Sequence, residues 1–171
     1  TSDHGEGMAA HHWVVKLGLY EEPGRVPLLL SCPGAIPDGT VNAGHLASGI
    51  DILPTMCDYT NVTCPEVTGI SLRPAVERPD DPGRPFLVSE LHPDPTDLDL
   101  QARMVRSPRH KYIAFSEGAN PEQLFDLESD PGETMNLAQS SSAGGVLASH
   151  RSMLSSWLTQ TSDPFSLPIG T

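Results

Sequence analysis

Aromatic and basic residues are scarce in this chain of 171 residues. Aromatic side chains make up only 5% of it, so a core must come mainly from Leu, Val, Ile and Ala. Ten Lys and Arg stand against 22 Asp and Glu, which gives a formal net charge of −12. Because this charge repels nucleic acids and anionic membranes, we expect neither as a partner. A cationic pocket for an anionic substrate would have to be local, built by a few residues.

Cysteines and long hydrophobic runs are also lacking. The three cysteines give neither a disulfide framework nor the spacing of a metal finger. Cys57 and Cys64 could pair around a short loop, although small apolar filler is the commoner role of a free cysteine. No run is long enough to span a membrane, and no secretory or lipidation signal is visible, so the compartment stays open. Seventeen prolines and fifteen glycines, in contrast, indicate many turns and irregular connections.

The first piece of the chain, residues 1–83, has the pattern of the end of an α/β domain. Residues 26–32 form a continuous apolar run, typical of a strand buried on both faces. Residues 43–61 repeat apolar side chains at helical spacing, with a kink or a second helix start expected at Pro54. Residues 8–19 are expected to be partly helical.

The second piece, residues 84–171, has the pattern of a small α+β domain. We expect four strands, at 85–91, 102–106, 111–115 and 123–127, and a helix at about 145–160. Short strands in succession favour an antiparallel meander, on which the helix packs. Ser141 or Ser142 is the expected helix cap.

Asp3-His4-Gly5 is the first candidate site. Neighbouring side chains can serve one centre only where the backbone turns, and Gly5 permits such a turn. A carboxylate beside an imidazole is half of a plausible shell for a divalent metal, with carboxylates favouring Ca²⁺ or Mg²⁺ and imidazole favouring transition metals. The alternative is that Asp3 caps a turn and His4 is merely exposed.

Lys16 is the second candidate, as the one basic residue in an apolar neighbourhood. Its ammonium must either reach water or meet an anion, and it suits an oxygen of sulfate or phosphate. His11 and His12 could supply a general acid or a hydrogen-bond donor, although at least one of the two is expected to be structural. For Arg25 we favour an ion-pair clasp that leads into the apolar run.

Several stretches together resemble the second half of the sulfatase active-site sequence. The stretches near the start are Thr1-Ser-Asp-His-Gly-Glu6, His11, Lys16, Tyr20-Glu21 and Arg25-Val-Pro27. The later ones are Pro33-Gly34, Ile50-Asp-Ile-Leu-Pro-Thr55, Gly69-Ile-Ser-Leu72, Arg103-Met-Val-Arg106, Lys111-Tyr-Ile113, Gln123-Leu-Phe-Asp126, Asp130-Pro-Gly-Glu133 and Asn136-Leu137. They span most of the chain in the family's order, so we expect an arylsulfatase-like protein of the alkaline phosphatase superfamily.

The resemblance implies a fold and a chemistry. The fold is an alkaline-phosphatase-like α/β domain, incomplete here, followed by a small domain with a four-stranded antiparallel sheet and one packed helix. Asp3 and His4 inherit the role of Ca²⁺ ligands, and Lys16 that of a sulfate contact. His11 falls on a histidine that some members carry near the substrate. The implied substrate is a sulfated small molecule or glycan.

One departure from the family limits what this chain can do. Sulfatases use a formylglycine made from the Cys or Ser of a C/S-x-P/A-x-R motif, and no Cys or Ser here heads one. We therefore expect the formylglycine, much of the metal shell and most of the central sheet to lie upstream, and the chain alone to be inactive. An apolar sheet face or edge at residues 26–32 would then be exposed.

Two other interpretations stay open. The first is a fragment of a phosphonate monoester or phosphodiester hydrolase of the same superfamily, in which the Asp–His pair would hold Mn²⁺ or Zn²⁺. The second is a non-catalytic binding module that keeps only the C-terminal unit. Residues 92–100 are the local candidate for substrate specificity.

Overall fold

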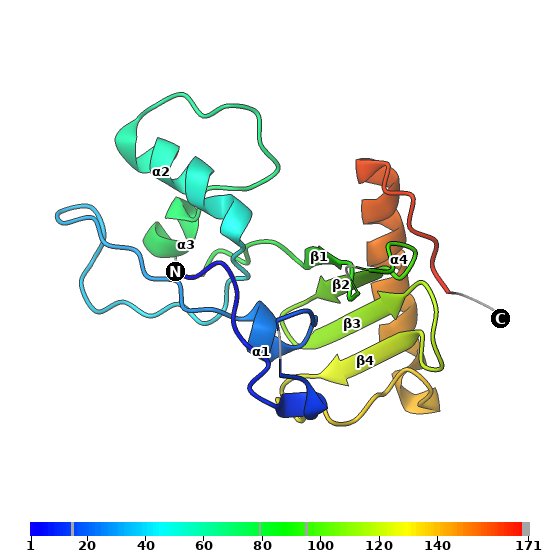
Figure 1. The fold of residues 1–171 in the computed structure, drawn as a ribbon. Coiled ribbons are helices and arrows are strands. Elements are labelled where there is room, and N and C mark those ends of the chain that lie inside the picture. Colours follow the sequence, from blue (N-terminus) through cyan, green and yellow to red (C-terminus); the bar gives the residue numbers. More distant parts are fainter. Residues whose placement is uncertain (15, 79, 95, 169–171) are drawn as a thin grey trace.

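The centre of the molecule is a four-stranded antiparallel sheet followed by a long helix (Figure 1). The computed structural model describes residues 1–14, 16–78, 80–94 and 96–168. The strands, in chain order and in sheet order, are β1 (Leu87–Leu91), β2 (Ala102–Arg106), β3 (His110–Phe115) and β4 (Glu122–Asp126), and the helix is α4 (Gly144–Thr161). The expected meander and packed helix are confirmed.

One face of the sheet is covered by α4. Side chains at helical spacing, Leu147, Leu154 and Leu158, are buried with Val105 and Leu124 of the strands in one apolar cluster. Every second residue of a strand points to this face, and residues three or four apart on α4 point back to it. The expected serine cap is wrong: Ser141–Ala143 forms a short 3₁₀ turn, and Ala143 holds the cap position without a side-chain hydrogen bond.

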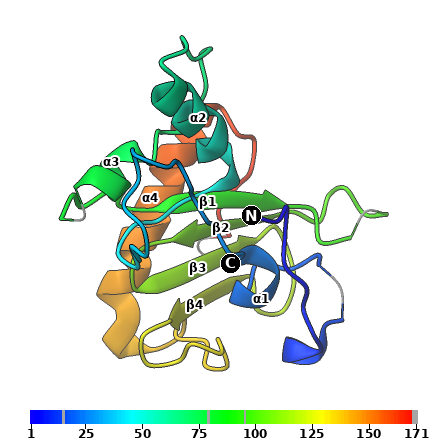
Figure 2. The same cartoon turned by 90° about the vertical axis from the view of Figure 1, so that its left-hand side faces the viewer.

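The opposite face of the sheet is covered by residues 19–24, which we call the arm. The arm includes the short helix α1 (Glu21–Gly24), and Figure 2 shows α1 in front of the sheet with α4 behind it. Leu19 is buried in a cluster with Met104, Ile113 and Phe125, and Tyr20 packs against it. The second unit is therefore three layers deep, and its third layer comes from the first piece of the chain.

The first piece contains no strand among its described residues, which corrects the α/β expectation for it. The run at residues 26–32 is irregular and largely exposed, with Leu29 79% accessible. A strand needs a neighbour to take up its backbone N–H and C=O groups, and this run has none. The expected exposure of apolar side chains is present, but on an irregular segment and not on a sheet.

The helix expected at residues 43–61 is shorter. A 3₁₀ turn, Gly49–Asp51, leads into α2 (Ile52–Thr60), and α3 (Arg73–Glu77) lies beside it, apart from the sheet (Figure 1). Pro54 lies in the first turn of α2, where its missing N–H needs no partner, so the helix is not kinked there.

Buried polar side chains join α2 to residues 69–72. Asp51 Oδ1 accepts a hydrogen bond from the backbone N–H of Ile70 at 2.9 Å, and Thr55 Oγ1 accepts one from Leu72 at 2.9 Å. Arg84 forms an ion pair with the fully buried Asp51. Two of the stretches that resemble the sulfatase sequence therefore meet in space.

Of the residues outside the described ranges, Val15 falls in the predicted segment 8–19 and Pro95 in the predicted segment 92–100. In the remainder of 8–19, only Ala10–His12 is helical, as a 3₁₀ turn. All three cysteines are free, as expected. None of the helices in the described ranges has both the length and the apolar character needed to cross a membrane. The boundary at residues 83/84 stays a prediction.

Candidate functional site

The two predicted metal ligands lie side by side near the start of the chain. Asp3 Oδ2 is 3.4 Å from His4 Nε2. Asp3 Oδ1 accepts hydrogen bonds from the backbone N–H of His4 at 3.0 Å and from Ser2 Oγ at 3.1 Å. These hydrogen bonds lower the pKa of Asp3, so its carboxylate is ionised at neutral pH.

The ring of His4 is held in one tautomer by its own loop. Its Nδ1 lies 2.7 Å from the carbonyl oxygen of Gly5. A carbonyl only accepts hydrogen bonds, so Nδ1 carries a proton, and in the neutral ring the lone pair is then on Nε2. Neutral imidazole with Nδ1–H bonded to a backbone carbonyl is the form in which histidine ligates metals.

Lys16 reaches the same place from twelve residues away. Its Nζ lies 3.2 Å from His4 Nε2, close enough to donate a hydrogen bond to that lone pair. The structure thus brings a carboxylate, an imidazole and an ammonium together. One lone pair cannot serve a lysine and a cation at once, so metal binding by His4 requires Lys16 to turn to another acceptor, such as an anion.

Gly5 fixes this loop against α1. Its backbone N–H donates to the carbonyl oxygen of Pro23 at 2.9 Å, and a Cβ at this position would lie 2.0 Å from the carbonyl oxygen of Glu22. Only glycine permits so close an approach of two backbones. The position of Asp3 and His4 therefore depends on the arm.

His11 has different neighbours. Its ring stacks on Tyr20 with 3.8 Å between centroids, and its Nε2 lies 3.8 Å from Glu22 Oε2. His11, Glu22 and Glu133 have potential ligand atoms within 4.8 Å of one another. However, Lys111 Nζ is 2.9 Å from Glu133 Oε1, so a fixed positive charge already occupies the cluster and disfavours a cation.

The clasp expected at Arg25 is wrong, because the Arg25 side chain is exposed. The ion pairs are made by Glu21 instead, whose Oε1 lies 2.9 Å from Lys111 Nζ and 3.3 Å from Arg106 Nε. Sequence reasoning missed these partners because 85 or more positions separate them from Glu21. One local feature could have indicated a buried ion pair: Lys111 lies in an otherwise apolar strand pattern.

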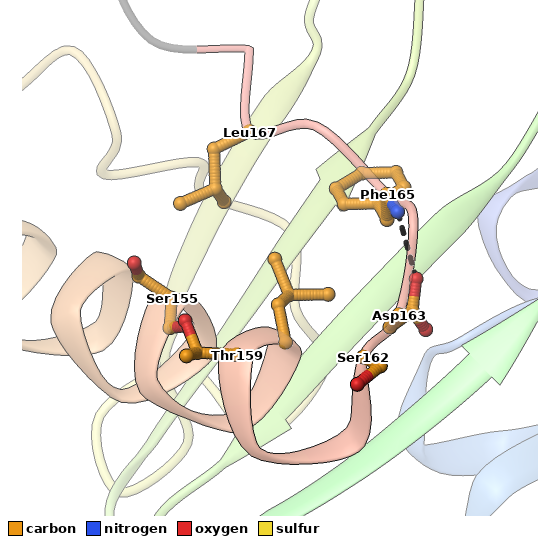
Figure 3. Close-up of a pocket in the computed structure, with 7 residues that line it drawn as sticks. Ser155, Thr159, Ser162, Asp163, Phe165 and Leu167 are labelled. Carbon is orange, nitrogen blue, oxygen red and sulfur yellow. Dashed lines mark hydrogen bonds between the residues drawn. The ribbon is translucent and has the colours of Figure 1, made fainter.

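A separate surface pocket lies where α4 ends (Figure 3). It is lined by Ser155, Leu158, Thr159, Ser162, Asp163, Phe165 and Leu167. Asp163 accepts a hydrogen bond from the backbone N–H of Phe165 at 2.8 Å, and Arg103 binds both of its carboxylate oxygens. The carboxylate of this pocket is thus already neutralised, and the other polar lining groups are hydroxyls.

Comparison with known proteins gives one consistent answer. Residues 9–160 match the family model described as N-sulphoglucosamine sulphohydrolase, C-terminal. The chain is 38% identical over 169 residues to a Delta 4,5-hexuronate-2-O-sulfatase of Bacteroides thetaiotaomicron, covering 96% of this chain and 35% of that protein. It is 36% identical to human Arylsulfatase K, covering 81% of this chain and 27% of that protein. The chain therefore spans about a third of these relatives' length.

Solved structures of two kinds of hydrolase superpose on the chain. A 2-O GAG sulfatase superposes with a TM-score of 0.84 and 35% identity over 98% of this chain and 38% of its own. A phosphonate monoester hydrolase of Agrobacterium radiobacter superposes with a TM-score of 0.73 and 27% identity, over 93% of this chain and 34% of its own. Lys16 and His11 lie within the residues matched by the family model, whereas Asp3 and His4 precede them.

Proposed function

This chain belongs to the sulfatase family, whose C-terminal domain it carries, and we propose that it serves sulfate-ester hydrolysis by supplying two metal ligands and a sulfate-binding lysine. The observation that carries the proposal is the meeting of Asp3, His4 and Lys16 at 3.2–3.4 Å. An anionic ester and a divalent cation together would satisfy all three groups.

Asp3 and His4 are the proposed Ca²⁺ ligands. The ionised carboxylate and the Nε2 lone pair of the neutral ring are both ligand groups, and their 3.4 Å separation suits adjacent ligands on a cation with bonds of about 2.4 Å. Because Ca²⁺ takes about six to eight ligands, the remaining ligands would come from outside this pair. When bound, the cation would withdraw charge from the oxygens of the ester.

Lys16 is the proposed sulfate contact. If His4 ligates a cation, the ammonium of Lys16 loses its present acceptor and can bind a sulfate oxygen. There it would stabilise the charge that develops on the leaving oxygen. His11 is the proposed hydrogen-bond donor at the edge of the substrate. Its stacking on Tyr20 fixes the plane of the ring.

The proposed substrate is a sulfated glycan. The relatives support this class: one is named for a hexuronate 2-O-sulfate, and a solved neighbour with 25% identity and a TM-score of 0.79 was described in complex with its substrate D-glucosamine-2-N,6-O-disulfate. Because no Cys or Ser of this chain heads a formylglycine motif, we propose that the chain alone does not turn over sulfate esters.

A chimera tests the proposal. The matched C-terminal third of the Bacteroides hexuronate-2-O-sulfatase would be replaced by this chain, and hydrolysis of a 2-O-sulfated unsaturated disaccharide followed with and without Ca²⁺. We expect Ca²⁺-dependent turnover that falls at least about 100-fold with Asp3→Asn or Lys16→Met. His12→Asn, at the exposed residue that follows His11 in the chain, is the matched control. A folded chimera without hydrolytic activity would instead support the non-catalytic binding module.

A second candidate is phosphonate monoester or phosphodiester hydrolysis with Mn²⁺ or Zn²⁺ at Asp3 and His4. The observation in its favour is the superposition on the phosphonate monoester hydrolase. The same chimera assayed with a phenylphosphonate monoester discriminates the two functions, because turnover of this ester with Mn²⁺ and none of the sulfate ester would replace the first proposal.

A further inference from the structure

Four charged side chains from distant parts of the chain meet under the arm. Glu21 belongs to the arm, Arg106 and Lys111 to β2 and β3, and Glu133 to the loop after β4. Glu21 Oε1 lies 2.9 Å from Lys111 Nζ, and Lys111 Nζ lies 2.9 Å from Glu133 Oε1. The four formal charges add up to zero.

The sheet places its two cations where they need an anion. Arg106 and Lys111 are directly opposite each other in the β2–β3 ladder, on the face that the arm covers. Like charges at such a pair destabilise a sheet. Glu21 resolves the conflict, because one oxygen of its carboxylate contacts both side chains. Arg106 and Lys111 thus form a cationic site on the sheet that binds the Glu21 carboxylate of the arm.

This contact is buried, and at Glu133 burial outweighs the attraction of Lys111 and raises the pKa of the carboxyl. The side chains of Lys111 and Glu133 are each only 1% exposed. Burial pushes the pKa of Glu21 upward, but Lys111 and Arg106 outweigh it and hold that pKa below its ordinary value. Glu133 also accepts a hydrogen bond at 2.6 Å from the backbone N–H of Glu21, so the arm is held by its backbone as well as by its side chain.

The arm in turn holds the proposed catalytic loop. Gly5 is bonded to the carbonyl oxygen of Pro23 and lies against that of Glu22, directly after Glu21. His11 stacks on Tyr20, whose hydroxyl donates to Gln123 Oε1 of β4 at 3.1 Å. A continuous path of contacts therefore runs from Lys111 in the sheet to His4 in the site.

We propose that Lys111 is a positioning residue, which together with Arg106 and Glu133 anchors the arm through Glu21 and thereby sets the position of Asp3 and His4. This assigns the C-terminal sheet an indirect role at the proposed site, through the arm. The inference rests on the proposed function for its consequence in catalysis, but the anchoring can be measured on this chain without any turnover.

The first test is amide hydrogen exchange on the chain with Lys111→Met. We expect the amides of Gly5, Glu21 and Arg25 to exchange at least about tenfold faster, while those of β2 to β4 and α4 keep their protection. Lys111→Arg, which keeps the charge, should recover much of the protection. Arg109→Met, at an exposed cation near the same strand, is the matched control. Unchanged exchange at Gly5 and Glu21 would overturn the proposal.

Glu21→Gln is a second variant in case Lys111→Met does not fold. It removes the charge of the arm that pairs with Lys111 and changes no residue of the sheet. It should release the same amides as Lys111→Met. If both variants instead loosen the sheet and the arm to the same extent, Lys111 is only a structural residue and the proposal fails.

The second test separates this proposal from the proposed function. In the chimera, Lys111→Met should raise the Ca²⁺ concentration for half-maximal activity by about 10- to 100-fold, the range for residues that orient metal ligands. Lys111→Arg should restore most of it. An inactive parent chimera would count against the proposed function alone, since the exchange result would still decide the anchoring. An unchanged Ca²⁺ requirement in Lys111→Met would refute positioning.

Discussion

The two pieces of the chain differ in where their apolar side chains go. In the second piece Val105, Leu124 and Leu154 are fully buried between sheet and helix. In the first piece Leu29 and Met56 are 79% and 61% exposed. A meander pairs its strands with one another within residues 87–126, whereas a central strand of an α/β sheet needs neighbours from elsewhere. The comparison teaches that apolar composition alone does not make a core.

The arm is the exception in the first piece. It is buried because Leu19 packs in an apolar cluster on the sheet and because Glu21 forms ion pairs with two cations of the sheet, Arg106 and Lys111. The loop of Asp3 and His4 is bonded to the arm through Gly5, whereas residues 26–32 are largely exposed. The first piece therefore has two parts that differ in their relation to the sheet. The arm and the loop bonded to it are attached to the sheet, whereas residues 26–32 are not.

The largest difference between the pieces should appear on removing apolar side chains. Leu154→Ala leaves a cavity between α4 and the sheet and should lower the free energy of unfolding by about 4 kcal/mol. Leu29→Ala, the matched change in the exposed run, should alter it by less than about 0.5 kcal/mol. Urea unfolding followed by circular dichroism measures both. Equal losses would mean that residues 26–32 are buried in solution.

The next effect should come from the buried ion pair of Arg103 and Asp163. Their side chains are 5% and 6% exposed, with Arg103 Nε 2.9 Å from Asp163 Oδ2. Arg103→Met leaves a buried carboxylate unpaired and should cost about 3 kcal/mol in the same assay. Arg78→Met, whose side chain is 67% exposed at its pair with Asp81, should leave the unfolding midpoint unchanged. Similar midpoints for the two variants would contradict the assigned burial.

A smaller effect should depend on pH. Burial lowers the pKa of His150, whose ring nitrogens contact Ser107 Oγ at 3.0 Å and the carbonyl oxygen of Val146 at 2.8 Å. Below pH 6.5, the ordinary pKa of histidine, the unfolded chain therefore binds more protons than the folded one, and stability falls as the pH falls.

His150→Gln should flatten this decline between about pH 7.5 and about pH 5.5, as measured by unfolding midpoints across the range. Because burial also lowers the pKa of His110, a residual slope should remain. An identical pH dependence in the wild type and in His150→Gln would show that His150 is not buried in its neutral form.

The smallest effect on stability should accompany a large local one. Gly5→Ala forces its Cβ against the carbonyl oxygen of Glu22, so the loop must move, and the nearest atoms that this Cβ meets belong to α1. We expect an unchanged unfolding midpoint, a shifted His4 ring signal in NMR spectra, and Ca²⁺ activation of the chimera weakened at least about tenfold. Gly24→Ala, where a Cβ meets open space, is the control and should change neither.

Much of the second piece could be predicted from local pattern. The four strands deviate from their expected bounds by at most two residues, and α4 by one at each end. The periodicity of these segments carries this information, because each buries its apolar face against its neighbours in the chain. The strand expected at residues 26–32 failed for the same reason: its pattern reports an environment that the chain itself does not supply.

The candidate site divides in a similar way. Asp3, His4 and Lys16 could be named from the sequence as a carboxylate, an imidazole and an ammonium suited to a cation and an anion. The ion pairs of Glu21 could not, since Lys111 and Arg106 lie 85 or more positions away and carry no local sign of their partner.

What the sequence determined by itself is therefore the meander, the packed helix and the residue types at the site, because these depend on side-chain period and chemistry. What only the tertiary structure decided is the place of the arm on the sheet, the tautomer of His4 and the contact of Lys16 with it. These depend on distances between residues far apart in the chain, and such distances are set by packing and buried charge after the elements have formed.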